Sequence, residues 1–282
     1  MKRILLAGAT GYLGNFILQE LVKQGYATTV LVRNKAALKV IDPAAITVKE
    51  AAITAPASIR GCCNNIDVVI SSVGITRQKD HLTYMDVDYQ ANLNLLQEAQ
   101  QSGVKKFIYV AVLHGPELRD LKICAAKERF VEALKKSGLD YCIIRPTGFF
   151  SDMTAYLDMA KKGTVYLFGK GTAKMNPIHG ADLANVCVAA IQEPALEIEA
   201  GGREILTQHE IAHIAFTVLH KKVKIAYIPH WIRRLILSLL RLFTSSKTYG
   251  PVEFALTVIS MDMIAPPFGQ HTLKEYFSQQ QP

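Results

Sequence analysis

Three glycines, Gly8, Gly11 and Gly14, recur at intervals of three residues in the segment GATGYLG near the start of the chain. The apolar segment RILLA precedes them and a helical pattern follows, so they should form the turn between a strand and a helix. Glycines at such a turn let the backbone approach a pyrophosphate, and the helix N-terminus offers free N–H groups and a positive dipole end. The spacing therefore predicts a dinucleotide-binding turn formed by Gly8, Thr10, Gly11, Tyr12, Leu13 and Gly14.

The end of the second predicted strand, VLVRN, discriminates between two forms of such a ligand. Folds specific for NAD place an acidic residue there, which binds the ribose hydroxyls. This chain has Arg33 and, two residues later, Lys35. A guanidinium can bind a 2′-phosphate with two hydrogen bonds, whereas a carboxylate repels it. We therefore expect NADP(H) rather than NAD(H), and the alternative is that Arg33 is a solvated loop residue.

A second motif, HEIAH, places His209 and His213 one helical turn apart with Glu210 between them, which is the spacing of zinc peptidases. The apolar residues of this helix fall largely on the other side, and the later histidine of the zinc motif is missing. We expect a solvated helix face after the cap-like Thr207, with no metal site. Asp182, which precedes another apolar run, fits an N-terminal cap or a first-turn acid better than a catalytic carboxylate.

These residues need a framework of strands and helices to position them. Short apolar segments predict strands at 3–7, 28–32, 45–48, 67–73, 106–112 and 140–145. Helical patterns alternate with them at 12–24, 85–101 and 121–136. Continuous apolar strands between helices predict a parallel sheet that is covered on both faces, in an α/β doubly wound, Rossmann-type fold.

The pattern changes after Pro146. Short strands are predicted at 164–168, 174–178, 203–207 and 224–228, and helices near 181–192, 208–219, 230–243 and 251–264. We see no flexible linker in the chain. We therefore expect a dinucleotide-binding domain at 1–150 and a smaller α/β lobe at 151–282 that is interleaved with it and carries the substrate side.

The composition limits the classes of function. The chain has 282 residues, of which 50% are hydrophobic and 20% charged, and its formal net charge is +8. Its basic residues are scattered, so the charge favours a phosphorylated small ligand over nucleic acid. The five cysteines show no C-x-x-C spacing, which favours buried, reduced thiols and a cytoplasmic protein. No apolar stretch approaches the ~20 residues of a membrane span.

Several segments together resemble a known family: GATGYLG, VLVRN, VVISSVG, KKFIYV and IIRPTGFF. They are similar to the atypical short-chain dehydrogenase/reductases, and more narrowly to the NmrA-like and divinyl-chlorophyllide-reductase-like branch. The segments NPIHGADLA, GGREILT and PPFGQHTL extend the resemblance through the second half. By this resemblance, Lys127 would hold the nicotinamide ribose and lower the pKa of a catalytic acid. It also implies a role for two short segments: adenosine and ribose would lie beside Ser71, Ser72, Val73 and Gly74, and the nicotinamide near Pro146, Thr147, Gly148 and Phe149.

The chain departs from the catalytic set of that family, which is Asn, Ser, Tyr and Lys. Ile123 stands four residues before Lys127, where the tyrosine would be. Ala111 and Val112 stand where the serine would be, and Asp88 takes the asparagine position. Isoleucine cannot donate a proton, so these positions do not support the usual carbonyl mechanism. Lys127 and Asp88 are the candidate catalytic residues; the alternatives are an exposed helix lysine and a surface or capping carboxylate.

Three kinds of chemistry stay open. Another group could act as the acid, and the candidates are Tyr109, Tyr141, Tyr156, His114 and Asp152. The acceptor could instead be a quinone or a conjugated double bond that takes its proton from water, or the cofactor could be bound without turnover. The sequence favours an NADPH-dependent reductase acting on a small apolar or conjugated acceptor. The alternative is a non-catalytic NADP(H)-binding redox sensor or assembly protein.

One predicted helix, residues 230–243, is strongly apolar and carries Trp231 near one end and three arginines along its length. It could be a core helix or a lid whose arginines reach solvent. It could also be an interfacial helix attracted to anionic lipid, which would add a peripheral membrane contact to a small-molecule substrate among the partners.

Overall fold

The computed structural model describes residues 2–38, 43–76, 82–194 and 196–280. The chain divides into two compact units, which are residues 1–145 with 183–198, and residues 146–182 with 199–282. The main difference from the expected division at residue 150 is the segment 183–198, which belongs with the first unit. The chain therefore leaves the first unit after Arg145, returns to it at Leu183, and leaves it again after Ile198.

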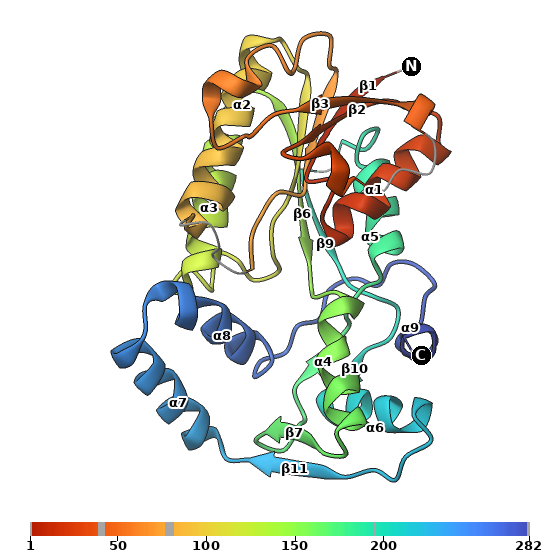
Figure 1. The fold of residues 1–282 in the computed structure, drawn as a ribbon, viewed down its shortest axis with the longest axis vertical. Helices are drawn as coiled ribbons and strands as arrows, with labels where there is room; N and C mark the ends of the chain where they lie inside the picture. The colour runs from red at the N-terminus through yellow and green to blue at the C-terminus, as the bar shows by residue number, and fades with distance from the viewer. Residues whose placement is uncertain (1, 39–42, 77–81, 195, 281–282) are drawn as a thin grey trace. The chain divides into compact units, whose positions relative to one another are not determined.

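The first unit is built on a seven-stranded sheet with the order β3-β2-β1-β4-β5-β6-β9 (Figure 1). Its strands are β1 (Arg3–Ala7), β2 (Ala27–Val32), β3 (Ile46–Glu50), β4 (Val68–Ser71), β5 (Lys106–Val110), β6 (Asp140–Pro146) and β9 (Glu197–Ala200). All neighbours from β3 to β6 pair in parallel. The strand order changes direction between β1 and β4. The crevice at their carboxyl ends is where open α/β sheets bind their ligands.

Apolar side chains on both faces make this sheet a core. Leu5, Val69 and Phe107, one from each of three central strands, are fully buried. The covering helices are α1 (Tyr12–Lys23), α2 (Asn92–Gln101), α3 (Lys122–Lys135) and α5 (Gly180–Ala189). Figure 1 shows α2 and α3 on one side of the sheet and α1 and α5 on the other. The predicted doubly wound Rossmann-type fold is confirmed.

The helix predicted at 85–101 consists of two elements. It begins with a π-helical segment, Met85–Ala91, and continues as α2. The Asn92 amide stabilises the wider turn, because it donates to the carbonyl oxygens of Val87 (3.2 Å) and Asp88 (3.1 Å). The same side chain accepts a 2.6 Å hydrogen bond from the Ser71 hydroxyl at the end of β4. Single π-helical turns within helices occur frequently at functional sites.

The second unit has shorter elements. Strand β7 (Val165–Phe168) pairs in parallel with β11 (Ile225–Ile228), and β8 (Lys174–Met175) pairs antiparallel with β10 (Leu206–Thr207). Its helices are α4 (Phe150–Lys161), α6 (Gln208–Val218), α7 (His230–Phe243), α8 (Ser246–Val258) and α9 (Leu273–Gln279).

Three predictions for this unit are corrected by the structure. The strands expected at 174–178 and 203–207 are only two residues long. Pro177 cannot donate to a strand ladder, and the buried Asn176 amide bonds the backbone of Gly202 and Ala265 instead. The helix expected at 251–264 lies at Ser246–Val258, because the Met263 N–H bonds the Lys174 carbonyl and draws the chain into a bridge with Met175.

Two further properties concern the chain as a whole. All five cysteines are unpaired and buried, as predicted. Among the residues that the structure describes, no helix is long and apolar enough to cross a membrane.

Candidate functional site

The glycine turn lies at the carboxyl end of β1, where the fold predicts a ligand. Gly8 has a φ of +95°, a conformation that L side chains rarely adopt, and its carbonyl accepts the Gly11 N–H at 3.0 Å. A Cβ on Gly14 would lie only 2.0 Å from the Gly8 carbonyl oxygen, so helix and strand could not pack this closely with any other residue. Gly11 is the N-cap of α1, where a side chain would stand between the helix N-terminus and an approaching phosphate.

The segment after β4 lies beside this turn. A Cβ on Gly8 would meet the Ser72 hydroxyl at 2.6 Å, and the Ser72 N–H donates to the Ala7 carbonyl at 3.1 Å. The Ser71 hydroxyl is buried and bonds Asn92, so it is committed to the protein and not to a ligand. What this segment can offer a nucleotide is therefore its backbone, the half-buried Ser72 and the small size of Gly74.

Arg33 and Lys35 follow β2, the strand next to β1, and both side chains are exposed. The intervening Asn34 accepts the Ala36 N–H at 2.9 Å and so begins a short 3-10 helix, Lys35–Ala37. The structure thus places two cations at the carboxyl edge of the sheet, one strand away from the glycine turn. This is where a 2′-phosphate on the adenosine ribose would be recognised.

Lys127 and Asp88 form a buried ion pair, with 3.1 Å between Lys127 Nζ and Asp88 Oδ1. Asp88 is completely buried, and its other oxygen accepts the Ile75 N–H at 3.2 Å. The alternatives of an exposed helix lysine and a surface carboxylate are therefore wrong. A Cβ on Gly74 would lie 2.6 Å from the Asp88 carboxylate and 2.9 Å from the Lys127 ammonium, so the backbone at Gly74 packs directly on the pair.

Tyr109 completes the cluster, with its hydroxyl 3.5 Å from Lys127 Nζ. Its ring is completely buried and packs edge-on against Phe130 of α3, with 4.5 Å between the ring centroids. Burial raises the pKa of Tyr109 to about 12, although the nearby ammonium opposes the rise. Tyr109 is therefore a neutral phenol at physiological pH.

Opposing effects set the charges of the ion pair. Burial lowers the pKa of Lys127, but the Tyr109 oxygen and the Asp88 carboxylate together outweigh it, so the pKa is raised overall. Burial raises the pKa of Asp88, while the ammonium limits that rise. We describe the pair as ammonium and carboxylate, because each charge is the main compensation of the other in a buried site.

A second buried ion pair fixes helix α3, which carries Lys127. Arg145 at the end of β6 binds both carboxylate oxygens of Glu128, at 2.6 and 3.1 Å, and its Nε donates to Glu197 at 2.9 Å. Two parallel hydrogen bonds define an orientation as well as a distance. The bonds therefore anchor α3 one residue away from Lys127. The sequence does not predict this pair; its signal there is limited to an acid next to Lys127 and an arginine near the end of a buried strand.

The position of the missing family tyrosine offers no acid. Ile123 lies in the first turn of α3 and is buried, and so are Ala111 and Val112 after β5. Of the five alternative acids, Tyr109 is the one that contacts Lys127. Tyr141 follows the first residue of β6, so it lies at the opposite, amino-terminal edge of the sheet.

The remaining three alternative acids have other surroundings. His114 is half-buried in the turn after β5, with a φ of +55°. Asp152 and Tyr156 belong to α4 in the second unit. The Asp152 carboxylate accepts the Phe149 N–H at 3.0 Å, and burial raises its pKa. Tyr156 is almost completely buried, and burial raises its pKa as well.

The segment Pro146–Phe149, predicted to lie near the nicotinamide, continues directly from β6 and belongs to the second unit. Thr147 is held on both sides: its hydroxyl donates to the Asn176 carbonyl at 2.7 Å and its N–H to the Ala200 carbonyl at 3.1 Å. A Cβ on Gly148 would meet nothing within 4 Å. The role of this segment in cofactor binding stays a prediction.

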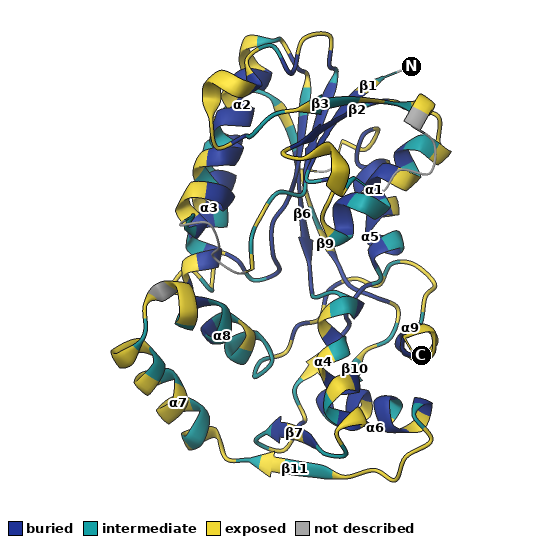
Figure 2. Ribbon diagram, in the orientation of Figure 1, coloured by how far each residue is buried: buried dark blue, intermediate teal, exposed yellow. Residues whose placement is uncertain are grey.

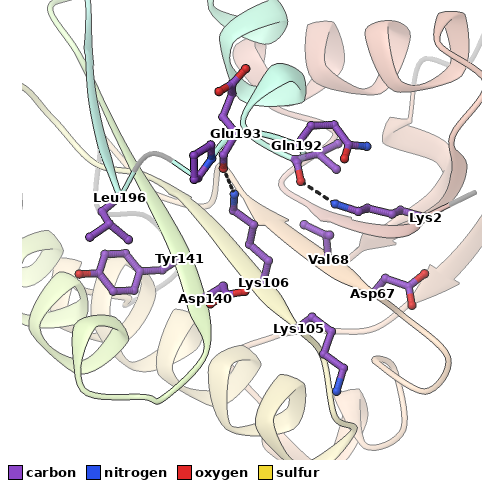
Figure 3. Close-up of a pocket in the computed structure, with 12 residues that line it drawn as sticks. Lys2, Asp67, Val68, Lys105, Lys106, Asp140, Tyr141, Gln192, Glu193 and Leu196 are labelled. Atoms are coloured by element: carbon purple, nitrogen blue, oxygen red, sulfur yellow. Dashed lines mark hydrogen bonds between the residues drawn. The ribbon is translucent and has the colours of Figure 1, made fainter.

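A depression of about 490 Å³ opens at the other edge of the first unit, beside the amino ends of β4, β5 and β6 (Figure 3). Two of its three lysines already bind backbone carbonyls. Lys106 Nζ donates to the carbonyls of Ala190 and Glu193, and Lys2 Nζ to that of Ile191, as Figure 3 shows in part. All three carbonyls lie just after the end of α5, so the two lysines cap the C-terminus of that helix. We assign this depression a structural role.

Both motifs outside the nucleotide site have structural partners. Glu210 and Thr207 form a capping box: the carboxylate accepts the Thr207 N–H at 2.8 Å, and the threonine hydroxyl accepts the Glu210 N–H at 3.2 Å. His213 is exposed on the same helix, as expected. Asp182 lies in the first turn of α5, as predicted, and its carboxylate also accepts the His271 N–H. Within the described ranges, no three acidic, histidine or cysteine side chains are placed to hold a metal.

Comparison with known proteins agrees with this geometry. A family model described as NAD(P)H-binding matches residues 8–194, which include the glycine turn, Asp88 and Lys127. The photosystem II assembly factor Ycf39 of Synechocystis is 27% identical over 86% of this chain and 75% of its own length. The divinyl chlorophyllide a 8-vinyl-reductase of Cucumis sativus is 26% identical over 97% of this chain and 75% of its own.

Solved structures show the same fold. The Escherichia coli NADPH-dependent quinone oxidoreductase QOR2, in complex with NADPH, superposes with a TM-score of 0.73 over 98% of this chain and 99% of that chain, at 20% identity. A Staphylococcus aureus nucleoside-diphosphate-sugar epimerase superposes with a TM-score of 0.76 over 98% and 99%, at 16% identity. The family model covers most of the chain, including the glycine turn at the end of β1 and the lysine of α3. This chain therefore belongs to the NAD(P)H-binding, atypical short-chain dehydrogenase/reductase family.

Proposed function

We propose that this protein is an NADPH-dependent reductase whose acceptor receives its proton from water and not from a side chain of α3. The single observation that carries the proposal is the buried cluster of Lys127, Asp88 and Tyr109, with Ile123 where the family has its acid. The cluster keeps a cation at the carboxyl edge of the sheet, but Ile123 has no proton to donate and burial raises the pKa of Tyr109 to about 12.

The residues of the first unit have separate roles in this proposal. The helix N-terminus at Gly11 binds the pyrophosphate, and Arg33 and Lys35 bind the 2′-phosphate that distinguishes NADPH from NADH. Lys127, anchored by Asp88, holds the nicotinamide ribose. NADPH, when bound, supplies a hydride; one proton from water completes the two-electron reduction of the acceptor.

The acceptor class follows from the missing acid. A ketone or aldehyde accumulates charge on its oxygen and requires a donor there, whereas a quinone or a conjugated carbon–carbon double bond delocalises the charge until water protonates it. The relative from Cucumis sativus is named a vinyl-reductase, which supports an acceptor of the second kind.

Two measurements test the proposal. The first is the dissociation constant of NADPH and of NADH, measured for the wild type and for Arg33→Ala. Arg60→Ala is the matched control, because it removes an exposed arginine outside the site. Loss of charged hydrogen bonds in Arg33→Ala should weaken NADPH binding about 10- to 100-fold and leave NADH nearly unchanged. Equal wild-type affinities for the two cofactors would refute the NADPH preference.

The second measurement is NADPH oxidation against matched panels of quinones, enones and aldehydes. We expect turnover on a quinone or an enone and none on aldehydes, with a reduced rate in Lys127→Met. Turnover confined to aldehydes would show that a protein acid exists and would overturn the mechanism.

A non-catalytic role is the second candidate, and Ile123 with the missing serine favours it. The Synechocystis relative is named an assembly factor, which supports a role other than catalysis for this chain. NADPH binding without oxidation on any acceptor, together with a cofactor-dependent change in proteolysis or hydrogen exchange, would favour a redox sensor.

A further inference from the structure

Helix α7 directs its apolar side chains to solvent. None of its 14 residues is buried, and Figure 2 shows it in the colours of exposed and intermediate residues along its length. Trp231, Leu235, Leu239 and Leu242 recur at intervals of three and four residues, so they form one line along the helix. Leu242 and Phe243 at the end of α7 are each 75% exposed.

Two arginines bind α7 to the neighbouring helix α8. Arg233 donates to the Leu256 carbonyl of α8 at 3.1 Å, and the Arg241 guanidinium binds the carboxylate of Glu253, which is buried in the same helix. In a globular protein an amphipathic helix normally buries its apolar stripe and exposes its polar face. Here the arginines hold α7 against α8, and the apolar line remains without a partner in the described chain.

We propose that α7 is an interfacial helix that docks this protein on an anionic lipid surface. The line of Trp, Leu and Phe side chains would enter the boundary between headgroups and acyl chains. The segment 230–248 contains no acidic residue, and Arg234 of α7 and Lys247 of α8 are exposed, so its charge complements anionic headgroups. At 1.5 Å per residue the helix is about 21 Å long, too short to cross a hydrocarbon core and suited to lying in the surface plane.

The same charges disfavour a second copy of the chain as the occupant. A two-fold contact places one surface against itself, so the basic residues of two copies would meet along α7. The segment 230–248 has no carboxylate to pair with them. The line of apolar side chains also lies along one helix rather than in a groove, which fits a fluid surface better than a partner that needs a pocket.

The chain has one tryptophan, and it is Trp231, so tryptophan fluorescence, excited selectively over that of the tyrosines, reports on α7 alone. The full chain is titrated with phosphatidylcholine vesicles that contain or lack phosphatidylserine, and co-sedimentation is measured in parallel. With anionic vesicles we expect a blue shift of the emission, protection from acrylamide quenching and recovery of the protein with the lipid. Neutral vesicles, and salt raised from about 0.05 M to about 0.5 M, should each weaken binding at least about fivefold.

Variants at exposed positions separate the contributions without disturbing the core. Leu239→Ser and Leu242→Ser should each lower the vesicle partition coefficient about tenfold, because each removes a leucine that would enter the lipid. Arg234→Gln should lower it about fivefold on anionic vesicles only. Ile205→Ser is the matched control, since Ile205 is an exposed apolar residue of the same unit outside α7, and it should bind like the wild type.

Three results would overturn this proposal. The first is no blue shift and no co-sedimentation with anionic vesicles. The second is equal binding to neutral and anionic vesicles, because the charge argument would then fail. The third is a blue shift that rises with protein concentration in the absence of lipid, together with a doubled molecular mass, because this would assign the surface to a second copy. None of the residues proposed to bind NADPH belongs to α7, so these outcomes are distinguishable from a failure of the proposed function.

Discussion

Replacement of Lys127 by methionine tests whether the buried ion pair organises the cofactor site. Methionine preserves most of the length and the apolar stem of the lysine but removes the ammonium 3.1 Å from the Asp88 carboxylate. The Asp88 side chain is completely buried and would keep one N–H donor, that of Ile75. Breaking such a pair by removing one partner costs about 3–5 kcal/mol, because a buried charge is left uncompensated.

The pH dependence of this loss can be worked out from the linkage between protonation and folding. In Lys127→Met the pKa of the folded Asp88 carboxyl rises above its unfolded value of about 3.9, so the folded state binds more protons than the unfolded state. Relative to the wild type, in which burial already raises the pKa of Asp88, the destabilisation begins only above that raised pKa. It then grows by about 1.4 kcal/mol per pH unit until the pKa of the folded variant is reached, and it is at most about 4 kcal/mol at pH 7.

The assay is urea unfolding at several values between about pH 5 and pH 8, followed by the change in far-UV circular dichroism. Lys136→Met, an exposed lysine at the end of the same helix, is the control and should change the free energy of unfolding by less than about 0.5 kcal/mol. The double variant Asp88→Asn/Lys127→Met removes the carboxyl and should abolish the pH slope. A Lys127→Met protein as stable as the control at pH 7, or a loss independent of pH, would refute the reasoning.

Three further predictions follow from single contacts. Gly74→Ala puts a Cβ 2.6 Å from the carboxylate of the ion pair, so it should displace Lys127 and weaken NADPH binding at least about tenfold by fluorescence titration. Tyr109→Phe should retain most of the turnover, because the hydroxyl is buried beside Lys127; loss of a proton donor would instead cost about 10²–10⁴-fold. Arg3, which pairs with Asp67, lowers the pKa of that carboxyl from 3.8 to about 2. The contribution of this pair to the free energy of unfolding is therefore present above pH 3.8 and is lost as the pH falls toward 2. After allowance for solvent screening, the difference between wild type and Asp67→Asn in urea unfolding should be about 1 kcal/mol at pH 5 and vanish near pH 2.

Local patterns predicted the first unit well because its central strands, such as β1 and β4, are buried on both faces. A strand with apolar residues at every position, such as β4, differs from a helix or a loop in its sequence alone. The second unit offers weaker signals. Its helix α9 has seven residues, begins with the capping box of Thr272 and Glu275, and was not predicted. Strand β9, at the edge of the first unit's sheet, alternates charged and apolar residues over only four positions and was not predicted either.

The candidate site divides along the same line. The glycine turn could be predicted because its requirements are local: each glycine meets atoms within a few residues or on the adjacent strand. The partners of Lys127 could not, since Asp88 is brought inward by a π-helical turn that depends on the Asn92 amide and the Ser71 hydroxyl. Such a turn has no period in the sequence, because one side chain inserted into the backbone ladder creates it.

The two departures from the family pattern, Ile123 and Asp88, support the same conclusion about Lys127. In the family the lysine lowers the pKa of a neighbouring tyrosine, and an uncompensated positive charge is what makes this possible. Here a carboxylate 3.1 Å away neutralises most of that charge, and the tyrosine is absent. A neutralised lysine can still donate hydrogen bonds to ribose hydroxyls, which requires direction and not net charge. Loss of the acid and compensation of the lysine are therefore consistent changes, and together they leave a site that holds its cofactor without a protein proton donor on α3.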